Sequence, residues 1–336
     1  MLRLPPFTYH RPDRVDDAVE LLGEHGAAAL PVAGGTDLIP NMKHRLFEPA
    51  HLVSLTGIPD LGEIAVGDEE VVLGAAVTLS RAADHPEMAR VLPSLAEAAG
   101  LVAGPQIRNR GTLGGNLCLD TRCTYYNQTE FWRHALGYCL KKDGEVCHVT
   151  RVGKKCVAAH SADTPPVLMT LDAVADLQGP GGARTVPVRD FFVADGIWNT
   201  RREPGEIVVR IRVPRPAPGT RLAYLKLRQR KSIDFPLLSV AVAARLDPDG
   251  RVEDLRGVVT ALGSRPRELS GWDEIAVGEK LRPELCEALA ERAFRQCHPL
   301  ENIIVDPDWR RAMVPVYVRR ALGRIGSGGP VAAGAA

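Results

Sequence analysis

Apolar residues recur at helical spacing near both ends of the chain, and shorter apolar runs occupy the stretch between them. Val15, Ala18, Val19 and Leu22 predict an N-terminal helix that Gly26 ends. The same periodicity predicts helices over residues 92–104, 283–296 and 307–322. The short apolar runs predict strands, which we place at residues 28–32, 71–77, 167–177, 206–213, 239–246 and 255–262. Helices and strands mixed in this way indicate an α+β protein.

A proline-rich segment divides the pattern into two parts. Residues 214–219 read Pro-Arg-Pro-Ala-Pro-Gly, and prolines at this density are typical of a surface linker. We therefore expect one domain over residues 1–218 and a second, a small sheet with helices, over residues 219–325. The glycine- and alanine-rich residues 326–336 predict a disordered tail.

Composition narrows the class of protein. The 336 residues are 45% hydrophobic and carry a net charge of +1, so the chain can bury real cores but has no overall field to attract nucleic acid or a membrane surface. No apolar run reaches the roughly 18 residues of a membrane span. We expect a soluble, cytoplasmic protein with no nucleic-acid or membrane partner, and no signal peptide precedes Pro5.

Two glycine loops are candidates for binding an anion. The first loop, residues 33–37, follows a predicted strand and precedes a helical stretch, and the second loop, residues 112–116, follows a basic segment that ends at Arg110 and Gly111. Glycines let backbone N–H groups approach a phosphate, and a helix N-terminus adds partial positive charge. Neither loop fits the dinucleotide fingerprint of a Rossmann domain or a Walker A loop. The candidate residues are Ala33, Gly34, Gly35, Thr36, Asp37, Arg110, Thr112, Gly114, Gly115 and Asn116.

Cysteines are concentrated directly after the second loop. Five of the seven lie in one segment, at positions 118, 123, 139, 147 and 156. Disulfides are disfavoured without an export signal. Structural zinc would be consistent with the close pair Cys118 and Cys123, and an iron-sulfur cluster would be consistent with thiolates distant in sequence. Spacing alone does not choose between zinc and iron-sulfur.

The two loops resemble those of the FAD-binding subunits of molybdenum hydroxylases. Further likeness lies in Phe7-x-Tyr9-x-Arg11-Pro, in Ser161-Ala-Asp163-Thr-Pro-Pro and in Tyr224-x-Lys226-x-x-Arg, so it covers nearly the whole chain. The resemblance implies a two-part FAD-binding domain, FAD between the loops, and contacts from Asp163 and Lys226. It also implies a 2Fe-2S small subunit and a molybdopterin large subunit as partners, assembled as a dimer of heterotrimers.

An insert separates the second loop from the Ser-x-Asp segment. This cysteine insert, residues 119–160, resembles that of the 4-hydroxybenzoyl-CoA reductases, a branch of the family in which it holds a 4Fe-4S cluster. The resemblance assigns Cys123, Cys139, Cys147 and Cys156 as the cluster ligands and leaves Cys118 as a buried thiol, with exchange of Cys118 for Cys123 as the alternative. Cys286 falls in an amphipathic helix and is expected in a core.

The chain has no residue cluster that predicts catalysis by its own side chains. FAD and an iron-sulfur cluster would instead make it an electron-transfer subunit that relays electrons to its partners. The insert carries an excess of basic residues, which suggests that an acidic ferredoxin docks there as the donor. Two alternatives stay open: a flavin subunit of another molybdenum hydroxylase that oxidises a purine or N-heterocycle, and a flavin-binding scaffold with structural zinc. The basic residues are Arg122, Arg133, Lys141, Lys142, Arg151, Lys154 and Lys155.

Overall fold

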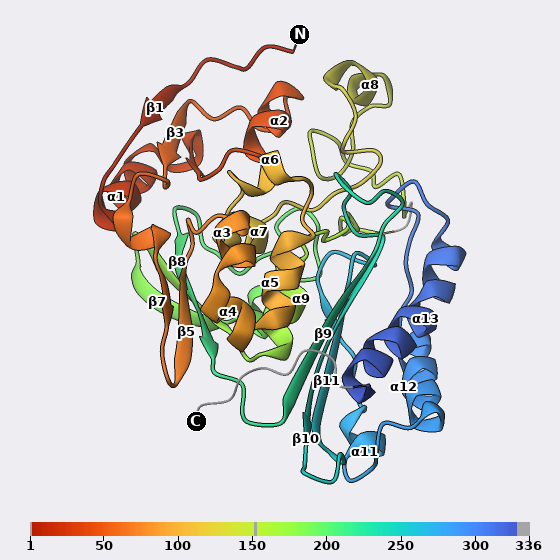
Figure 1. Ribbon diagram of the computed structural model, residues 1–336. Helices are drawn as coiled ribbons and strands as arrows, with labels where there is room; N and C mark the ends of the chain where they lie inside the picture. Colours follow the sequence, from red (N-terminus) through yellow and green to blue (C-terminus); the bar gives the residue numbers. More distant parts are fainter. Residues whose placement is uncertain (1, 151–152, 328–336) are drawn as a thin grey trace.

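The computed structural model describes residues 2–150 and 153–327 and contains three β-sheets with helices packed on them (Figure 1). No helix within these residues is long and apolar enough to cross a membrane. The mixture of sheets and helices confirms the α+β class expected from the pattern. Arg151 and residues 328–336 of the expected tail lie outside the described residues.

The N-terminal part is a small parallel sheet covered by one helix. Strands β1 (Thr8–His10), β3 (His51–Ser54) and β2 (Ala29–Val32) pair in that order. Helix α1 (Val15–His25) buries Ala18, Val19 and Leu22 against them and ends at Gly26, whose φ of 50° favours glycine. The 3-10 turn η1 (Gly26–Ala28) leads into β2, and α2 (Leu38–Lys43) follows the first loop.

The second sheet is antiparallel and has five strands in the order β4-β5-β8-β6-β7. Its valine, leucine and isoleucine side chains form the largest core together with the short helices α3 to α5. The strands are β4 (Ile64–Val66), β5 (Glu70–Gly74), β6 (Val174–Gly179), β7 (Gly182–Pro187) and β8 (Ile207–Pro214), and the turn η2 (Pro59–Gly62) precedes them. The helices are α3 (Leu79–Asp84), α4 (Pro86–Val91), α5 (Pro93–Gly100) and, after β7, α10 (Val188–Phe191).

Two predictions in this part are wrong in their details. The run at residues 167–177 begins as helix α9 (Thr164–Thr170) and becomes strand only at β6. Prolines in the first turn favour the start of the helix. All seven helical residues are buried, so the sequence shows no polar face from which a helical period could be recognised. The helix expected over residues 92–104 ends at Gly100.

The C-terminal sheet has a core on each face. Its order is β12-β11-β10-β9, and alternate residues of β9 show the two sides: Leu222 and Tyr224 face the large core, whereas Ala223 faces a second core. Helices α12 and α13 cover that second face (Figure 1). Elements here are β9 (Thr220–Leu227), β10 (Leu238–Leu246), β11 (Val252–Thr260), β12 (Arg267–Glu268), α11 (Asp273–Ala276), α12 (Pro283–Gln296) and α13 (Pro307–Gly326).

Helices α12 and α13 test two further predictions. Helix α12 has the predicted bounds, and the burial of Cys286 in the second core confirms its expected role. Helix α13 runs four residues beyond the predicted end at Leu322, because Leu322 and Ile325 are buried in the same core. Part of the expected tail is therefore helix.

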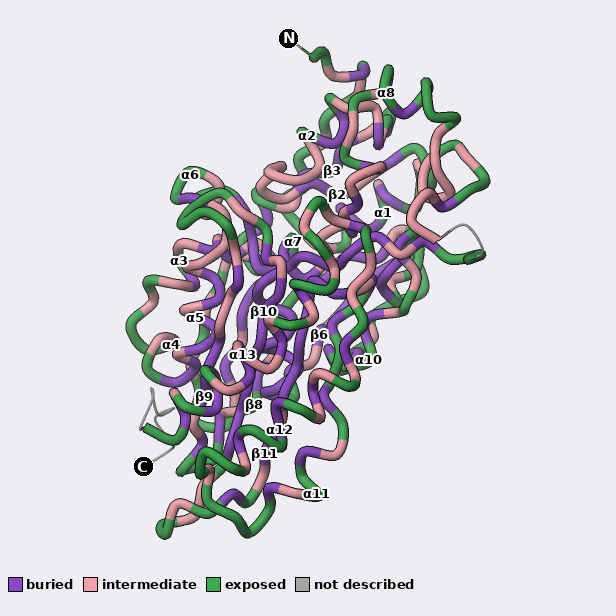
Figure 2. The backbone as a smooth tube through the Cα atoms, turned by 90° about the vertical axis from the view of Figure 1, so that its right-hand side faces the viewer, coloured by how far each residue is buried: buried purple, intermediate pink, exposed green. Residues whose placement is uncertain are grey.

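The cysteine insert is mostly loop. Among its described residues the one helix is α8 (Glu130–Ala135), at the rim of the molecule. The nearby tube is largely half-buried or exposed in Figure 2, whereas the strands are buried. Two short helices lie before the insert, where the sequence predicts only loop: α6 (Pro105–Arg108) and α7 (Leu113–Leu117).

Candidate functional site

The first loop presents a row of backbone N–H groups. In the described part of the chain, the N–H groups of Gly34, Gly35, Thr36 and Asp37 donate to no protein acceptor. Gly35 adopts a φ of 70°, which turns the chain sharply between β2 and α2. Successive free N–H groups in such a turn form a concave anion-binding nest. The half-buried loop, which begins at Ala33, can therefore receive a phosphate.

The first loop is in direct backbone contact with Arg110 and Gly111, which immediately precede the second loop. A Cβ atom on Gly34 would lie 1.8 Å from the carbonyl oxygen of Arg110 and 2.9 Å from the nitrogen of Gly111. Glycine at position 34 is therefore required by loop-to-loop packing, whether or not a phosphate is bound. The contact brings together residues that are far apart in sequence and leaves the Arg110 side chain exposed.

The second loop uses its N–H groups internally. Thr112 caps α7 by accepting from the N–H of Gly115 at 3.1 Å, and Gly114 donates to the carbonyl of Ala75 at 2.9 Å. A Cβ on Gly114 would meet Ala75 at 2.6 Å, so this glycine is also required by packing. Buried Asn116 accepts from the N–H of Thr164 at 3.1 Å. Only Gly115 is exposed, so the second loop contributes shape more than free donors.

Asp163 and Lys226 form a buried ion pair at 2.9 Å that joins the two parts of the chain. Their side chains are 3% and 1% exposed. Tyr224 donates to the same carboxylate at 2.5 Å, and Lys226 also donates to the carbonyl of Leu101. Burial raises the pKa of Asp163 although Lys226 opposes the shift, and burial lowers the pKa of Lys226 although Asp163 opposes it. The Lys226 ammonium is thus already paired within the protein.

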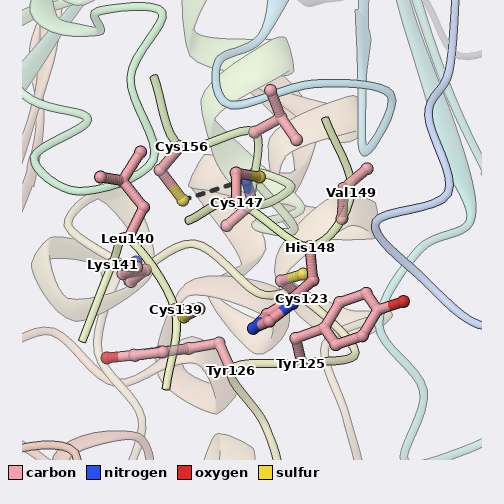
Figure 3. A pocket seen from close by; sticks show the side chains of 12 residues that line it. Cys123, Tyr125, Tyr126, Cys139, Leu140, Lys141, Cys147, His148, Val149 and Cys156 are labelled. Atoms are coloured by element: carbon pink, nitrogen blue, oxygen red, sulfur yellow. Dashed lines mark hydrogen bonds between the residues drawn. The ribbon is translucent and has the colours of Figure 1, made fainter. Parts of the chain in front are cut away.

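Four cysteines of the insert line one cavity. Cys123, Cys139, Cys147 and Cys156 come from separate loops, and Figure 3 shows their sulfur atoms turned toward a common space. The cavity also has aromatic and aliphatic walls. They include Tyr125, Tyr126, Leu140, Lys141, His148, Val149, Val157 and Ala158.

The protein around the thiol cavity presents donors to sulfur. Burial disfavours the Cys147 thiolate, but the nearby Thr150 and surrounding backbone N–H groups lower the pKa of this thiol below its ordinary value. Burial raises the pKa of Cys156 to about 11, although the N–H of Ala158, 3.5 Å from its sulfur, lowers it. Burial likewise raises the pKa of Cys123, and the nearby Cys139 and Cys147 raise it further. Charge on several of these thiols would need a bound cation.

Lys141 supplies a fixed positive charge beside the thiol cavity. Its ammonium donates to Asp120 at 2.6 Å and to the carbonyl of Gly196 at 2.7 Å, and it lies 4.6 Å from the ring centre of Tyr126. The same charge lowers the pKa of Cys156, although burial outweighs it. Lys141 thus ties the insert to the segment around Gly196 and faces the thiols.

Arg122 connects the thiol cavity to the first loop. It directly precedes Cys123, pairs with the carboxylate of Asp37 and donates to Asn41 at 2.9 Å. Its guanidinium also lies over the ring of Phe235 from the C-terminal part. Arg122 therefore links the two candidate sites, because its side chain binds the first loop and its backbone continues into Cys123 of the cavity.

These contacts correct the expected basic rim of the insert. Arg133 and Lys141 are 2% and 4% exposed, and Arg122 is paired with Asp37, so none of the three presents charge to solvent. The half-buried Lys142 pairs with Asp143. Only Lys154 and Lys155 of the described basic residues are fully exposed. The basic excess seen in the sequence therefore includes side chains that form ion pairs inside the protein and present no charge to solvent.

Cys118 also differs from its expected state. It is half-buried at the end of α7, not fully buried, and it does not line the thiol cavity. Burial raises the pKa of its thiol, and the charge of Arg202 partly offsets this. The structure therefore separates Cys118 from the other four thiols of the segment.

A glycine loop with free backbone N–H groups is typical of proteins that hold the phosphates of a nucleotide cofactor. Comparison with known proteins agrees. Residues 5–216 match the family model for the FAD binding domain in molybdopterin dehydrogenase, and residues 223–325 match that for the CO dehydrogenase flavoprotein C-terminal domain. The chain belongs to the molybdenum hydroxylase family, as one of its FAD-binding medium subunits.

Individual relatives cover nearly the full length. The carbon monoxide dehydrogenase medium chain of Hydrogenophaga pseudoflava is 34% identical over 318 residues, which are 95% of this chain and 96% of that one. A solved carbon monoxide dehydrogenase from the same organism, lacking the Mo-pyranopterin moiety, has a TM-score of 0.80 at 32% identity and covers 97% and 99% of the two chains. Quinoline 2-oxidoreductase from Pseudomonas putida 86 shares the fold, with a TM-score of 0.80 at 24% identity over 98% and 99%.

The residues present fit the FAD that this family binds. The free N–H groups at Gly34, Gly35, Thr36 and Asp37 form a cradle of the kind that a pyrophosphate requires. The contact between Gly34 and Arg110 keeps both loops at this cradle. FAD when bound supplies one- or two-electron chemistry, and the contribution of the chain is to hold and orient it.

Proposed function

We propose that the chain is the FAD- and 4Fe-4S-carrying electron-transfer subunit of a 4-hydroxybenzoyl-CoA reductase. In this proposal it relays electrons from reduced ferredoxin to a 2Fe-2S small subunit and a molybdopterin large subunit, in a cytoplasmic dimer of heterotrimers. The observation that carries the proposal is the convergence of Cys123, Cys139, Cys147 and Cys156 on one cavity. These are the four ligands that the resemblance assigns. Arg122, which precedes Cys123, pairs with Asp37 of the first loop.

The spacing of the thiols favours a cluster over a single zinc ion. Thiolates at about 2.3 Å from one tetrahedral zinc lie about 3.8 Å from one another. Within the described residues, the only three metal-ligating side chains mutually within 4.8 Å are histidines elsewhere, and the four thiols do not meet that limit. A 4Fe-4S cluster binds each thiolate to a different iron and so holds the sulfur atoms further apart.

Metal and sulfide analysis of the purified protein tests the proposal. We expect iron and acid-labile sulfide in equal amounts at the four thiols. Cys139→Ser should lose iron, because Cys139 lines the thiol cavity, and Cys118→Ser should keep iron, because Cys118 lies outside it. Zinc without sulfide that is lost in Cys139→Ser would establish the alternative of a flavin-binding scaffold with structural zinc. Iron lost with Cys118→Ser and kept with Cys123→Ser would overturn the ligand set.

The ligand variants have different expected effects on flavin. The chain around Cys156 is tied to other segments, because its carbonyl accepts from the N–H of Gly196 at 2.8 Å and from Ser264 at 3.2 Å. Cys139 lies in a turn whose backbone bonds stay within the insert, to Lys142 and Gly144. Cys139→Ser is therefore the variant that should lose iron and keep FAD.

A flavin subunit of another molybdenum hydroxylase, acting on a purine or N-heterocycle, is the competing function. The 34% identity to a carbon monoxide dehydrogenase medium chain over 95% of this chain supports a molybdenum hydroxylase other than a reductase. The two functions separate when the purified complex is assayed with each substrate class. Dehydroxylation of 4-hydroxybenzoyl-CoA with reduced ferredoxin supports our proposal, and oxidation of an N-heterocycle without turnover of the thioester contradicts it.

A further inference from the structure

Three histidines from separate elements meet at one end of the N-terminal sheet, away from the flavin loop. His10 ends β1, His51 begins β3 and His25 ends α1. One ring nitrogen from each lies within 4.8 Å of the other two, and all three residues are half-buried. This is the only such group of three or more metal-ligating side chains among the residues that the structure describes.

The backbone fixes the approach of the three rings. In the parallel pairing His10 is opposite Val53, and Val53 is two residues from His51, so both histidines project from the same face of the sheet. Helix α1 packs on Val53, and its last residue, His25, therefore lies over the same face. Strand pairing and helix packing, not loop conformation, bring the imidazoles together.

The contacts between the rings resemble those around a metal ion. Nε2 of His10 lies 3.0 Å from Nδ1 of His51. Two nitrogen ligands at about 2.05 Å from one tetrahedral ion lie about 3.3 Å apart, so these two imidazoles need little movement to share an ion. Desolvation, and then the charges that His25 and His10 would carry, lower the pKa of His51. The neutral imidazole is the form that ligates metals.

His25 must turn to complete the set. Its ring stacks on that of His51, with ring centres 3.7 Å apart and planes inclined by only 6°. A metal lies in the plane of each imidazole that binds it, so two parallel rings cannot share an ion in this arrangement. Rotation of a half-exposed side chain is fast and costs little. Glu24 lies near enough to His51 to raise its pKa, so a carboxylate is also at hand.

We propose that His10, His25 and His51 form a binding site for a divalent late first-row transition metal, such as Zn²⁺, that joins β1, β3 and α1. Imidazole is the side chain these ions share as a ligand, and three protein ligands with an open position are typical of accessible zinc sites. The site is separate from the thiol cavity, whose donors are sulfur. A bound ion would cross-link the small N-terminal sheet to helix α1 and stabilise their packing.

Zinc binding by the purified full-length holoprotein tests the site. After removal of loosely bound metal, the protein is dialysed against micromolar Zn²⁺ and bound zinc is measured. The native protein should bind one equivalent more than a His10→Gln/His25→Gln/His51→Gln variant. Loss of one ligand, in His25→Gln, should weaken zinc binding by at least about 10- to 100-fold, because losing a residue that only hydrogen-bonds to a metal ligand already costs that much. His298→Gln, at an exposed position, is the matched control.

Thermal unfolding provides the second measurement. An ion that binds only the folded state raises its stability, so zinc should raise the unfolding temperature of the native protein and of His298→Gln but not of the triple variant. In the structure His25 makes no side-chain hydrogen bond to its neighbours, and unchanged flavin content will show that His25→Gln is folded. Equal zinc content and equal zinc-induced shifts in the native and triple-variant proteins would overturn the proposal.

Discussion

Replacing Lys226 with methionine should destabilise the protein more than replacing Lys226 and Asp163 together. The single change removes the cation and leaves a carboxylate that is 3% exposed without its partner. The double change Lys226→Met/Asp163→Asn removes both charges and keeps an acceptor for Tyr224, which donates to Asp163 at 2.5 Å. An unpaired buried charge is more costly than a neutral amide in the same place.

The structure sets the expected magnitudes. Breaking a buried pair by removing one partner costs about 3–5 kcal/mol. The double variant still loses the donor to the carbonyl of Leu101, which costs about 1–3 kcal/mol. At roughly 2 °C for each kcal/mol in a large chain, the unfolding temperature should fall by about 6–10 °C in Lys226→Met and about 2–6 °C in the double variant.

The pH dependence has a definite sign. Burial raises the pKa of Asp163 in the folded protein, and loss of Lys226 raises it further. A carboxyl whose folded pKa is raised contributes stability at low pH that is lost as the pH rises through that pKa. The unfolding temperature of Lys226→Met should therefore drop, relative to the double variant, as the pH rises above the ordinary carboxyl pKa of 3.8.

The assay follows unfolding by circular dichroism and flavin release by fluorescence in the same samples. Lys231→Met, at an exposed position in the next loop, is the control and should leave both signals unchanged. The reasoning is refuted if Lys226→Met loses FAD while its unfolding temperature stays native. In that case Lys226 would act on the flavin directly, as the family resemblance implies, and not through its ion pair.

Three further predictions concern other sites. Burial disfavours the Asp176 carboxylate, but hydrogen bonds from Arg212 outweigh it and lower the pKa of Asp176 below 3.8. The stability of the native protein should therefore fall as the pH drops through 3.8 and below, and it should fall less steeply in Asp176→Asn. Equal slopes of stability against pH in the two proteins would contradict this. Gly34→Ala should misfold and lose FAD, whereas Gly181→Ala, at an exposed position where a Cβ meets nothing within 4 Å, should stay folded and keep FAD. Soluble yield and flavin absorbance will show this, and a folded, flavin-loaded Gly34→Ala would disprove the packing argument. Reversing Lys154 and Lys155 to glutamate should slow reduction by ferredoxin about tenfold at low salt without affecting reduction by an uncharged dye, and unchanged kinetics would place the donor elsewhere.

Local pattern was sufficient for features whose cause is local. The strand, glycine turn and helix around residues 33–37 follow from backbone preferences, and helix α12 follows from a clear helical period. The run at residues 167–177 misled because a short helix buried on all sides has no polar face to reveal its period.

Long-range pairs could not be read from the sequence. The sequence around Lys141 and Arg122 does not show that each pairs with a distant acidic residue, Asp120 and Asp37 respectively. From sequence alone both residues are therefore expected to contribute surface charge. The role of Gly34 as a packing position also depends on Arg110, and the histidine group depends on strand pairing. His148 and Tyr126, which line the thiol cavity, carried no sequence signal beyond their nearness to cysteines.

The contacts of Asn302 with the cysteine insert set an order of events during synthesis of the chain. Its carbonyl accepts from the N–H of Thr124 at 2.9 Å, and its side chain donates to the carbonyl of Val157 at 2.6 Å. Thr124 and Asn302 are 178 residues apart, so at about 5–20 residues per second the ribosome needs roughly 9–36 s to deliver the second after the first. For that interval the thiols next to Thr124 and Val157 lack their final support. The cavity that these thiols line is therefore completed only after the C-terminal part has been synthesised and folded.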